Sequence, residues 1–192
     1  MQLKALLVNG DLERGELLRQ SLQTLGHEVV SDIAVDSNLL AGVEAHNPDV
    51  LVIHCDRPGD ALLSQLRELL LNRPMPVVLF TSEDNHDVIR RAVRAGVSAY
   101  VVDGLSEKRV GSVLEVAIAR FTETERLRRE LADTRANLVE RKAVERAKGI
   151  LMKQRGFDEP QAYHALRKMA MDRNLRIGEV AENVIAVADL LN

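Results

Sequence analysis

Residues 50–54 read VLVIH, a run in which the first four side chains are aliphatic. A strand with aliphatic side chains on both faces is covered on both faces, and such strands are typical of parallel sheets. Similar runs bounded by turn residues occur at Leu3–Asn9, Glu28–Ile33, Val77–Thr81 and Ala99–Val102. The sequence therefore predicts five strands, with residues 50–54 as a buried one.

Helical patterns separate the five predicted strands. Helices are expected at Leu12–Leu25, Asn38–His46, Gly59–Leu71, Asn85–Ala95 and Ser106–Arg120. Strands that alternate with helices form a parallel sheet with helices on both faces. The ligands of such sheets bind at the carboxyl ends of the strands, near the switch in strand order. The side chains expected there are Asn9, Gly10, Asp11, His54, Thr81 and Asp103.

The composition is that of a folded protein large enough for one α/β domain and a small appendage. Of the 192 residues, 46% are hydrophobic and 29% are charged. The single cysteine, Cys55, excludes an internal disulfide. No apolar run approaches the roughly 20 residues that cross a bilayer, and no signal-peptide pattern opens the chain. We therefore expect a cytoplasmic protein with no membrane contact.

The first part of the chain resembles a response-regulator receiver domain, a flavodoxin-like fold. The resemblance covers residues 1–118 and is carried by LLVNGD, PDVLVIHCDRPG, PVVLFTS and RAGVSAYVVDG. In that family an acidic pair after the first strand holds Mg²⁺, an aspartate that ends the third strand accepts the phosphoryl group, and a lysine ends the fifth. Here Asn9 and Gly10 precede a single Asp11, and the other two positions hold His54 and Asp103. Thr81 and Tyr100 match the family's switch hydroxyl and aromatic residue.

These departures predict a pseudo-receiver. Mg²⁺ needs several oxygen ligands, and an aspartyl phosphate needs a carboxylate nucleophile, so we expect neither a metal nor phosphorylation at this position. A phosphohistidine or a metal ligand at His54 is the alternative. The five histidines show no metal-ligand spacing, so a structural role for His54 is favoured. No cofactor is expected. No nucleophile–base pair or phosphate-binding loop appears, so an enzyme is not predicted.

Residues 119–140 form the expected linker. Their main part, FTETERLRRELADTRANLVE, has neither glycine nor proline and should continue the preceding helix. A heptad-like seam, about two heptads long, is formed by Thr124, Leu127, Leu131, Thr134 and Leu138. A single helix that lies on its own domain is one reading of this seam. Self-association as a coiled coil is favoured, because an isolated polar helix of this length is marginal in water.

Residues 141–192 are expected to form a small basic three-helix bundle. Ten Lys and Arg stand against four Asp and Glu over residues 141–176, whereas the rest of the chain is acidic. Such a segment favours a polyanionic partner. The first helix, Arg141–Arg155, should bury Ala143, Ala147, Ile150 and Leu151. Gly149 lies inside this helix at a cost of about 1 kcal/mol, which a closely approaching backbone or ligand would explain.

Two further helices complete the predicted bundle. Gly156 is a candidate helix stop, and Asp158 is a candidate cap for a helix at Pro160–Asp172. Tyr163 is expected to point inward, and Arg167 and Lys168 outward. A third helix is predicted at Ile177–Leu191. Three helices in about 50 residues are marginal alone, and dimerisation is expected to stabilise them.

The runs AVERAKGILMKQRG, DEPQAYHALRKMAMDRN and VAENVI resemble the ANTAR family of transcription antitermination domains. With VSAYVVDGL upstream, the resemblance narrows to NasT-like regulators of nitrate and nitrite assimilation. It implies binding to paired hairpins in leader mRNA, which prevents termination, and a nitrate- or nitrite-sensing protein that inhibits the regulator. The RNA-binding side chains are expected to be Arg141, Lys142, Arg146, Lys148, Lys153, Arg167, Lys168 and Arg173.

Two other functions are open at this stage. The first is a DNA-binding response regulator with a helix-turn-helix tail, but the acidic third helix is a poor major-groove reader. The second is a signalling scaffold that uses His54 and binds no nucleic acid, which leaves the basic segment unexplained. With aromatic residues at 3% and no tryptophan, base stacking is not expected to dominate any RNA contact. Lys148 and Arg167 are expected to be exposed phosphate contacts.

Overall fold

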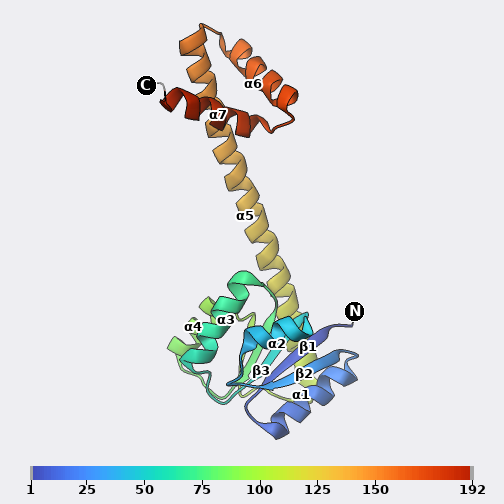
Figure 1. Ribbon diagram of the computed structural model, residues 1–192. Coiled ribbons are helices and arrows are strands. Elements are labelled where there is room, and N and C mark those ends of the chain that lie inside the picture. Colours follow the sequence, from blue (N-terminus) through green and yellow to red (C-terminus); the bar gives the residue numbers. More distant parts are fainter. Residues whose placement is uncertain (1, 191–192) are drawn as a thin grey trace. The chain divides into compact units, whose positions relative to one another are not determined.

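The computed structural model describes residues 2–190 of the chain (Figure 1). The chain forms two compact units, Met1–Glu125 and Arg126–Asn192. One helix, α5 (Glu107–Arg155), contributes residues to both units. The predicted helix at residues 106–120, the linker and the helix at residues 141–155 are therefore parts of one continuous helix.

The first unit contains a five-stranded parallel sheet in the order β2-β1-β3-β4-β5. The strands are β1 (Lys4–Asn9), β2 (Glu28–Ala34), β3 (Val50–His54), β4 (Val77–Thr81) and β5 (Ala99–Val102). The helices between them are α1 (Leu12–Thr24), α2 (Leu39–His46), α3 (Asp60–Asn72) and α4 (His86–Ala95). This arrangement confirms the predicted flavodoxin-like fold. The strand order reverses beside β1, so the carboxyl ends of β1 and β3 border the switch point.

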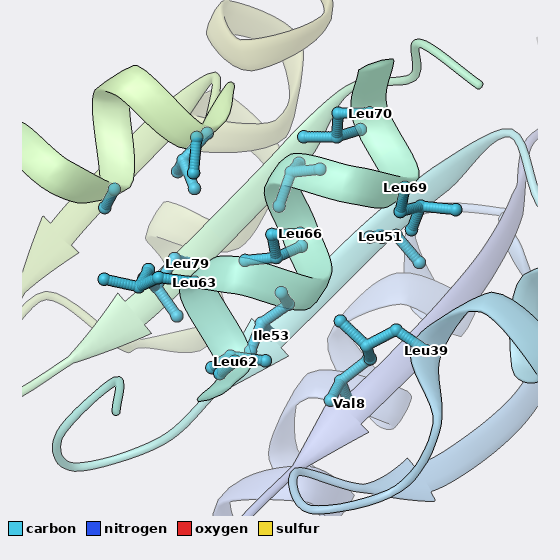
Figure 2. Close-up of a cluster of buried hydrophobic side chains, with 14 of the residues drawn as sticks. Val8, Leu39, Leu51, Ile53, Leu62, Leu63, Leu66, Leu69, Leu70 and Leu79 are labelled. Atoms are coloured by element: carbon cyan, nitrogen blue, oxygen red, sulfur yellow. The ribbon is translucent and has the colours of Figure 1, made fainter. Parts of the chain in front are cut away.

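Two apolar layers cover the two faces of this sheet. In one layer the leucines of α3, among them Leu62, Leu66 and Leu69, pack against side chains of β1, β3 and β4 (Figure 2). In the other layer α1 and the first turns of α5 cover the opposite face. All residues of β3 and β4 are buried, as the aliphatic run at residues 50–54 indicates for a central strand.

Helix starts differ from the predicted ones by one residue for a chemical reason. Asn38 and Asn85 were expected to be the first helical residues, but their backbones are extended and their side chains cap the helices. Each side-chain oxygen accepts a hydrogen bond from a backbone N–H of the first turn, which has no partner within the helix. Gly96 ends α4 with a φ of 107°, a conformation that favours glycine.

The second unit packs the last part of α5 against α6 (Glu159–Arg173) and α7 (Ile177–Leu190). Leu191, the last residue of the predicted third helix, lies outside the described residues. The buried core of this unit consists of Val144, Ala147, Leu166, Ala170, Val180 and Ala181. Asp158 and Gln161 form a reciprocal capping box at the start of α6. The side chain of Glu140 accepts a hydrogen bond of 3.2 Å from the N–H of Gly178.

Because this core is small, a single cavity in it should be costly. Replacement Leu166→Ala is expected to lower the free energy of unfolding by about 2–5 kcal/mol, since Leu166 is fully buried. Met171 on the same helix is largely exposed, so Met171→Ala should change the free energy of unfolding by less than about 0.5 kcal/mol. Urea unfolding followed by far-ultraviolet circular dichroism measures both. Equal effects of the two substitutions would contradict this packing.

Candidate functional site

The pocket at the carboxyl edge of the sheet collects three of the predicted site residues. His54, Thr81 and Asp103 line one cavity of about 100 Å³, together with Arg14, Gly104 and Leu105. Thr81 ends β4 and His54 ends β3, so the parallel sheet brings their side chains to one edge. Sequence reasoning missed Arg14. Its place one turn into α1, the helix that starts at this edge, was the available signal.

His54 is 1% exposed, and its two ring nitrogens have different surroundings. Nε2 lies 3.4 Å from Nη1 of Arg14, and the arginine can only donate, so Nε2 is the acceptor of this pair. Nδ1 is buried and has no hydrogen-bond partner among the described residues. Burial, followed by the positive charge of Arg14, lowers the pKa of His54 below its usual value. His54 is therefore a neutral, buried side chain where a receiver carries its aspartate.

Asn9, Gly10 and Asp11 are engaged in building the start of α1. The side chain of Asp11 accepts a 3.0 Å hydrogen bond from the N–H of Arg14 and caps the helix. This bond is the main cause of the lowered pKa of Asp11. The side chain of Asn9 accepts a hydrogen bond from the N–H of Asp11, and the N–H of Gly10 donates to the carbonyl of His54. Asp11 therefore acts as a helix cap.

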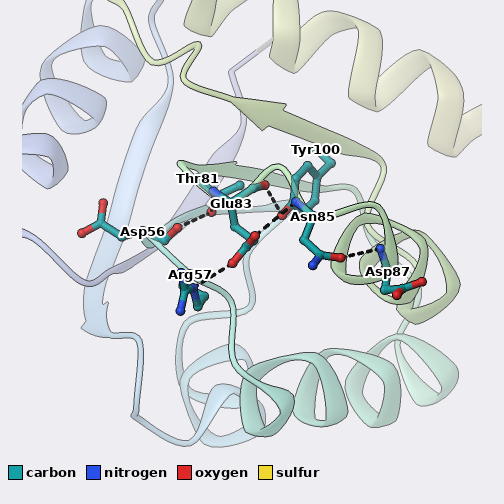
Figure 3. A network of polar contacts seen from close by, with 7 residues as sticks. All are labelled: Asp56, Arg57, Thr81, Glu83, Asn85, Asp87 and Tyr100. Atoms are coloured by element: carbon teal, nitrogen blue, oxygen red, sulfur yellow. Dashed lines mark hydrogen bonds and ion pairs between the residues drawn. The ribbon is translucent and has the colours of Figure 1, made fainter.

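Thr81 and Tyr100 belong to a polar network around the β4–α4 loop (Figure 3). The Thr81 hydroxyl donates to the backbone carbonyl of Asp56 at 2.8 Å and accepts from the N–H of Glu83. The Tyr100 hydroxyl donates to the carbonyl of Glu83 at 2.8 Å. The carboxylate of Glu83 in turn pairs with Arg57 at 2.7 Å. The switch hydroxyl and the aromatic residue thus both hold the β4–α4 loop.

The groups around this pocket differ from those of the receiver pattern. Within residues 2–190, no group of three or more His, Cys, Asp and Glu side chains is arranged to hold a metal ion. Asp103, in the position of the expected lysine, has a φ of 46° and an exposed side chain. The pocket is therefore lined by a guanidinium, an imidazole, a hydroxyl and the carboxylate of Asp103, and the nearby charges of Asp56 and Asp11 also act on His54.

Most of the predicted RNA-binding residues are exposed cations on α5 and α6. Seven of the eight are exposed: Arg141, Lys142, Arg146 and Lys153 on α5, and Arg167, Lys168 and Arg173 on α6. Arg146 forms an ion pair with Asp189 at 2.8 Å. The other six make no ion pair with a described residue. We call these seven side chains the cationic surface.

Lys148 was expected to be exposed, and this expectation is wrong. Its side chain lies against the start of α6 and is 7% exposed overall. Nζ contacts Glu159 at 2.8 Å and Glu145 at 2.9 Å. Hydrogen bonds to Glu159 and then Glu145 raise the pKa of Lys148, while Lys148 lowers the pKa of Glu159. Lys148 ties α5 to α6, so its charge reversal would disturb the unit itself and cannot serve as a clean test of RNA contact.

Tyr163 was also misplaced by sequence reasoning. It was expected to point into the bundle, but it is 46% exposed on α6. Arg167 follows it by four residues on the same helix, so the two side chains are neighbours on one helix face. Arg155 and Arg176 are further exposed cations that the sequence analysis counted but did not single out. A hydrophobic pattern alone could not reveal that Ala162, Leu166 and Ala170, without Tyr163, fill the inner face of α6.

The seam on the linker part of α5 is open to solvent. Leu127, Leu131 and Leu138 are each about half exposed, at 51%, 51% and 53%. Three leucines at this spacing form an apolar stripe along a helix whose other residues are mostly charged. None of the described helices is long and apolar enough to span a bilayer.

A known domain family matches the second unit. The ANTAR domain model matches residues 132–185, which covers the end of the linker, the cationic surface and most of α7. The Nitrate regulatory protein of Klebsiella oxytoca is 46% identical over 68 residues, which are 35% of this chain and 17% of that protein.

One relative matches most of the chain, including both units. The transcriptional regulatory protein PdtaR of Mycobacterium tuberculosis is 32% identical over 174 residues, which are 91% of this chain and 83% of that protein. The first unit resembles a CheY-like receiver domain from Methanospirillum hungatei, with a TM-score of 0.56 at 17% identity over 65% of this chain and 99% of that one. The likeness to the Methanospirillum hungatei receiver domain concerns the fold only. From the match to PdtaR, together with the ANTAR domain, the chain belongs to the family of ANTAR-domain transcriptional regulators with a receiver-like first domain.

Proposed function

We propose that this protein is an RNA-binding transcription antiterminator that binds hairpins in leader mRNA and prevents a terminator from forming. The observation that carries the proposal is the cationic surface on α5 and α6, within an ANTAR domain and in a chain that is otherwise acidic. A polyanion is the partner that such a charge distribution favours. Lys and Arg side chains would contact phosphates and fix the position of the RNA.

The exposed pair of Tyr163 and Arg167 adds a way to read bases. Hairpin loops present unstacked bases, which proteins bind by stacking them on aromatic rings or on guanidinium planes. Tyr163 is half exposed beside a free arginine, so it can stack with a loop base while neighbouring cations hold phosphates. This arrangement favours RNA hairpins over duplex DNA, whose bases are not available for stacking. It also favours RNA over a scaffold that binds no nucleic acid.

Control of the regulator is proposed to come from a protein partner. The pocket holds His54 in place of the phosphoacceptor, and Thr81 and Tyr100 already hold the β4–α4 loop. A sensor protein that binds nitrate or nitrite is the proposed partner, and nitrate or nitrite assimilation genes are the proposed targets. The similarity of the second unit to the Nitrate regulatory protein supports this part of the proposal.

The active form is proposed to be a homodimer that associates through the linker and the second unit. Leu127, Leu131 and Leu138 are half exposed in the single chain. Pairing two such stripes as a coiled coil would bury them, and burial of a leucine contributes about 1.5–3 kcal/mol. Two RNA-binding units in one dimer would suit a pair of hairpins, because the second contact becomes intramolecular.

The RNA contact is tested by Arg167→Glu, measured against a leader RNA with two hairpins over a salt series. Loss of a phosphate or base contact should weaken binding at least about tenfold and lower the salt slope by about 1 or more. Arg94→Glu on α4 is the control, because it makes the same charge change at an exposed arginine of the first unit. Duplex DNA of equal length should bind more weakly than the RNA. Equal affinity for both, or no salt dependence, would refute the proposal.

The pocket is tested with acetyl phosphate and Mg²⁺. No phosphorylated species is expected by intact-protein mass spectrometry, since His54 is buried, neutral and held beside Arg14. RNA affinity should be the same with and without this treatment. A phosphoryl group on His54 or on the neighbouring Asp56 would contradict control by a protein partner alone.

The dimer is tested by Leu131→Lys in sedimentation equilibrium experiments. A charge on the seam should raise the dimer dissociation constant by more than about tenfold, because a buried leucine contact is replaced by a cation. Ala132→Lys introduces the same charge one position away, outside the seam, and should leave the dissociation constant nearly unchanged. A wild-type protein that stays monomeric at all concentrations would overturn this part of the proposal.

A further inference from the structure

Gly149 occupies the interior of α5, inside the cationic surface. Glycine is the least favourable ordinary residue for a helix interior apart from proline, because it has the most backbone freedom to lose. A glycine in such a position requires a reason, either inside the folded chain or in something that the chain binds. A reason inside the folded chain can be tested directly from the atoms around each glycine.

Each of the other ten glycines either has a steric or conformational reason within the chain or lies outside a helix interior. Three have positive φ angles: Gly26, Gly96 and Gly156. Five lie where a Cβ would come within 3.2 Å of another atom: Gly15, Gly42, Gly104, Gly111 and Gly178. Gly10 lies between β1 and α1, where glycine carries no helix cost. Gly59 is the N-cap of α3, a position where glycine is well tolerated.

Gly149 has none of these reasons. Its backbone is helical, and a Cβ built on it meets no atom within 4 Å among the described residues. The helix cost of this glycine predicts that a backbone or a ligand approaches closely here. No part of the described chain does so, which leaves an external partner.

The surroundings of Gly149 identify the kind of partner. Its neighbours one turn away on the helix are Glu145, Arg146, Met152 and Lys153, and all are exposed. Lys148 contacts both Glu145 at 2.9 Å and Glu159 at 2.8 Å, and Arg146 pairs with Asp189 at 2.8 Å. Lys153, and Lys142 two turns before Gly149 on the same face, have no ion-pair partner within the described part of the chain. The glycine thus forms a bare backbone patch on a helix face that carries two unpaired cations.

We propose that the RNA touches the α5 backbone at Gly149, with Arg146 and Lys153 on either side of the contact. This inference rests on the proposed function and adds the place where the RNA comes closest to the helix. A sugar or phosphate oxygen can approach the Cα–H group of a glycine, which a side chain at that position would block. The flanking cations then hold the neighbouring phosphates.

A second copy of the chain is a poorer occupant of this patch. In a two-fold dimer the same patch faces itself, so Lys153 and its equivalent would be brought together without a compensating charge. The exposed leucines of the linker offer the chain a better surface for self-association. Charge complementarity therefore favours RNA at Gly149.

The test is Gly149→Ala in the full-length protein, because here stability and binding should change in opposite directions. Alanine is the better helix former and meets no clash, so the thermal unfolding midpoint should rise by about 4–8 °C for a unit of this size. Affinity for the two-hairpin leader RNA should nevertheless fall at least about two- to fivefold, the factor that corresponds to one lost Cα–H···O contact. Gly149→Gln, also compatible with a helix, should weaken binding further because its side chain is larger.

Gly59→Ala is the matched control, since it makes the same change at another glycine with open space around it, in the first unit. It should leave RNA affinity unchanged. Unchanged affinity of Gly149→Ala, with wild-type RNA binding intact, would overturn this inference and leave the proposed function standing. Absence of RNA binding by the wild type would instead refute the proposed function. A Gly149→Ala protein whose dimer dissociation constant changes in sedimentation equilibrium would assign the patch to a second copy and overturn the inference.

Discussion

The burial of apolar side chains of α5 is the constraint on which both units depend. Val110, Leu114 and Ala117 belong to the core beneath the sheet, and Val144 and Ala147 belong to the core of the second unit. Between these two buried stretches, α5 runs through residues that are almost all exposed. An isolated polar helix of that length is marginal in water, so its ends must be fixed by packing. Each unit therefore stabilises the helix that the other also requires.

The pocket of the first unit is held together by hydrogen bonds to backbone groups. Asp11 caps α1, and Thr81 with Tyr100 holds the β4–α4 loop through backbone groups. These contacts are made by side chains and backbone groups of the chain itself. His54 fills the central position as a buried neutral group. The first unit has the fold of a receiver domain, and the proposed control by a protein partner would act on that fold.

The sequence predicted the sheet well because the length and burial of aliphatic runs determine where the strands lie. Aliphatic runs such as residues 50–54 and 77–81 have one stable location, the centre of a covered sheet. The cationic surface was predicted in outline, but Lys148 and Tyr163 were placed on the wrong sides of their helices. Lys148 is held by Glu159, eleven residues away, and such a partner cannot be found from helical periodicity. Arg14 was missed because only the folded sheet edge brings it to His54.

The two tyrosines are divided between the two units, one in each. Tyr100 is partly buried, with its hydroxyl bonded to the carbonyl of Glu83, while Tyr163 is half exposed on α6. The chain has no tryptophan, so these two rings dominate its intrinsic fluorescence. Replacing either ring by phenylalanine leaves a protein with one natural optical probe in a known unit. The order in which the two halves lose structure can thus be followed without attaching any label.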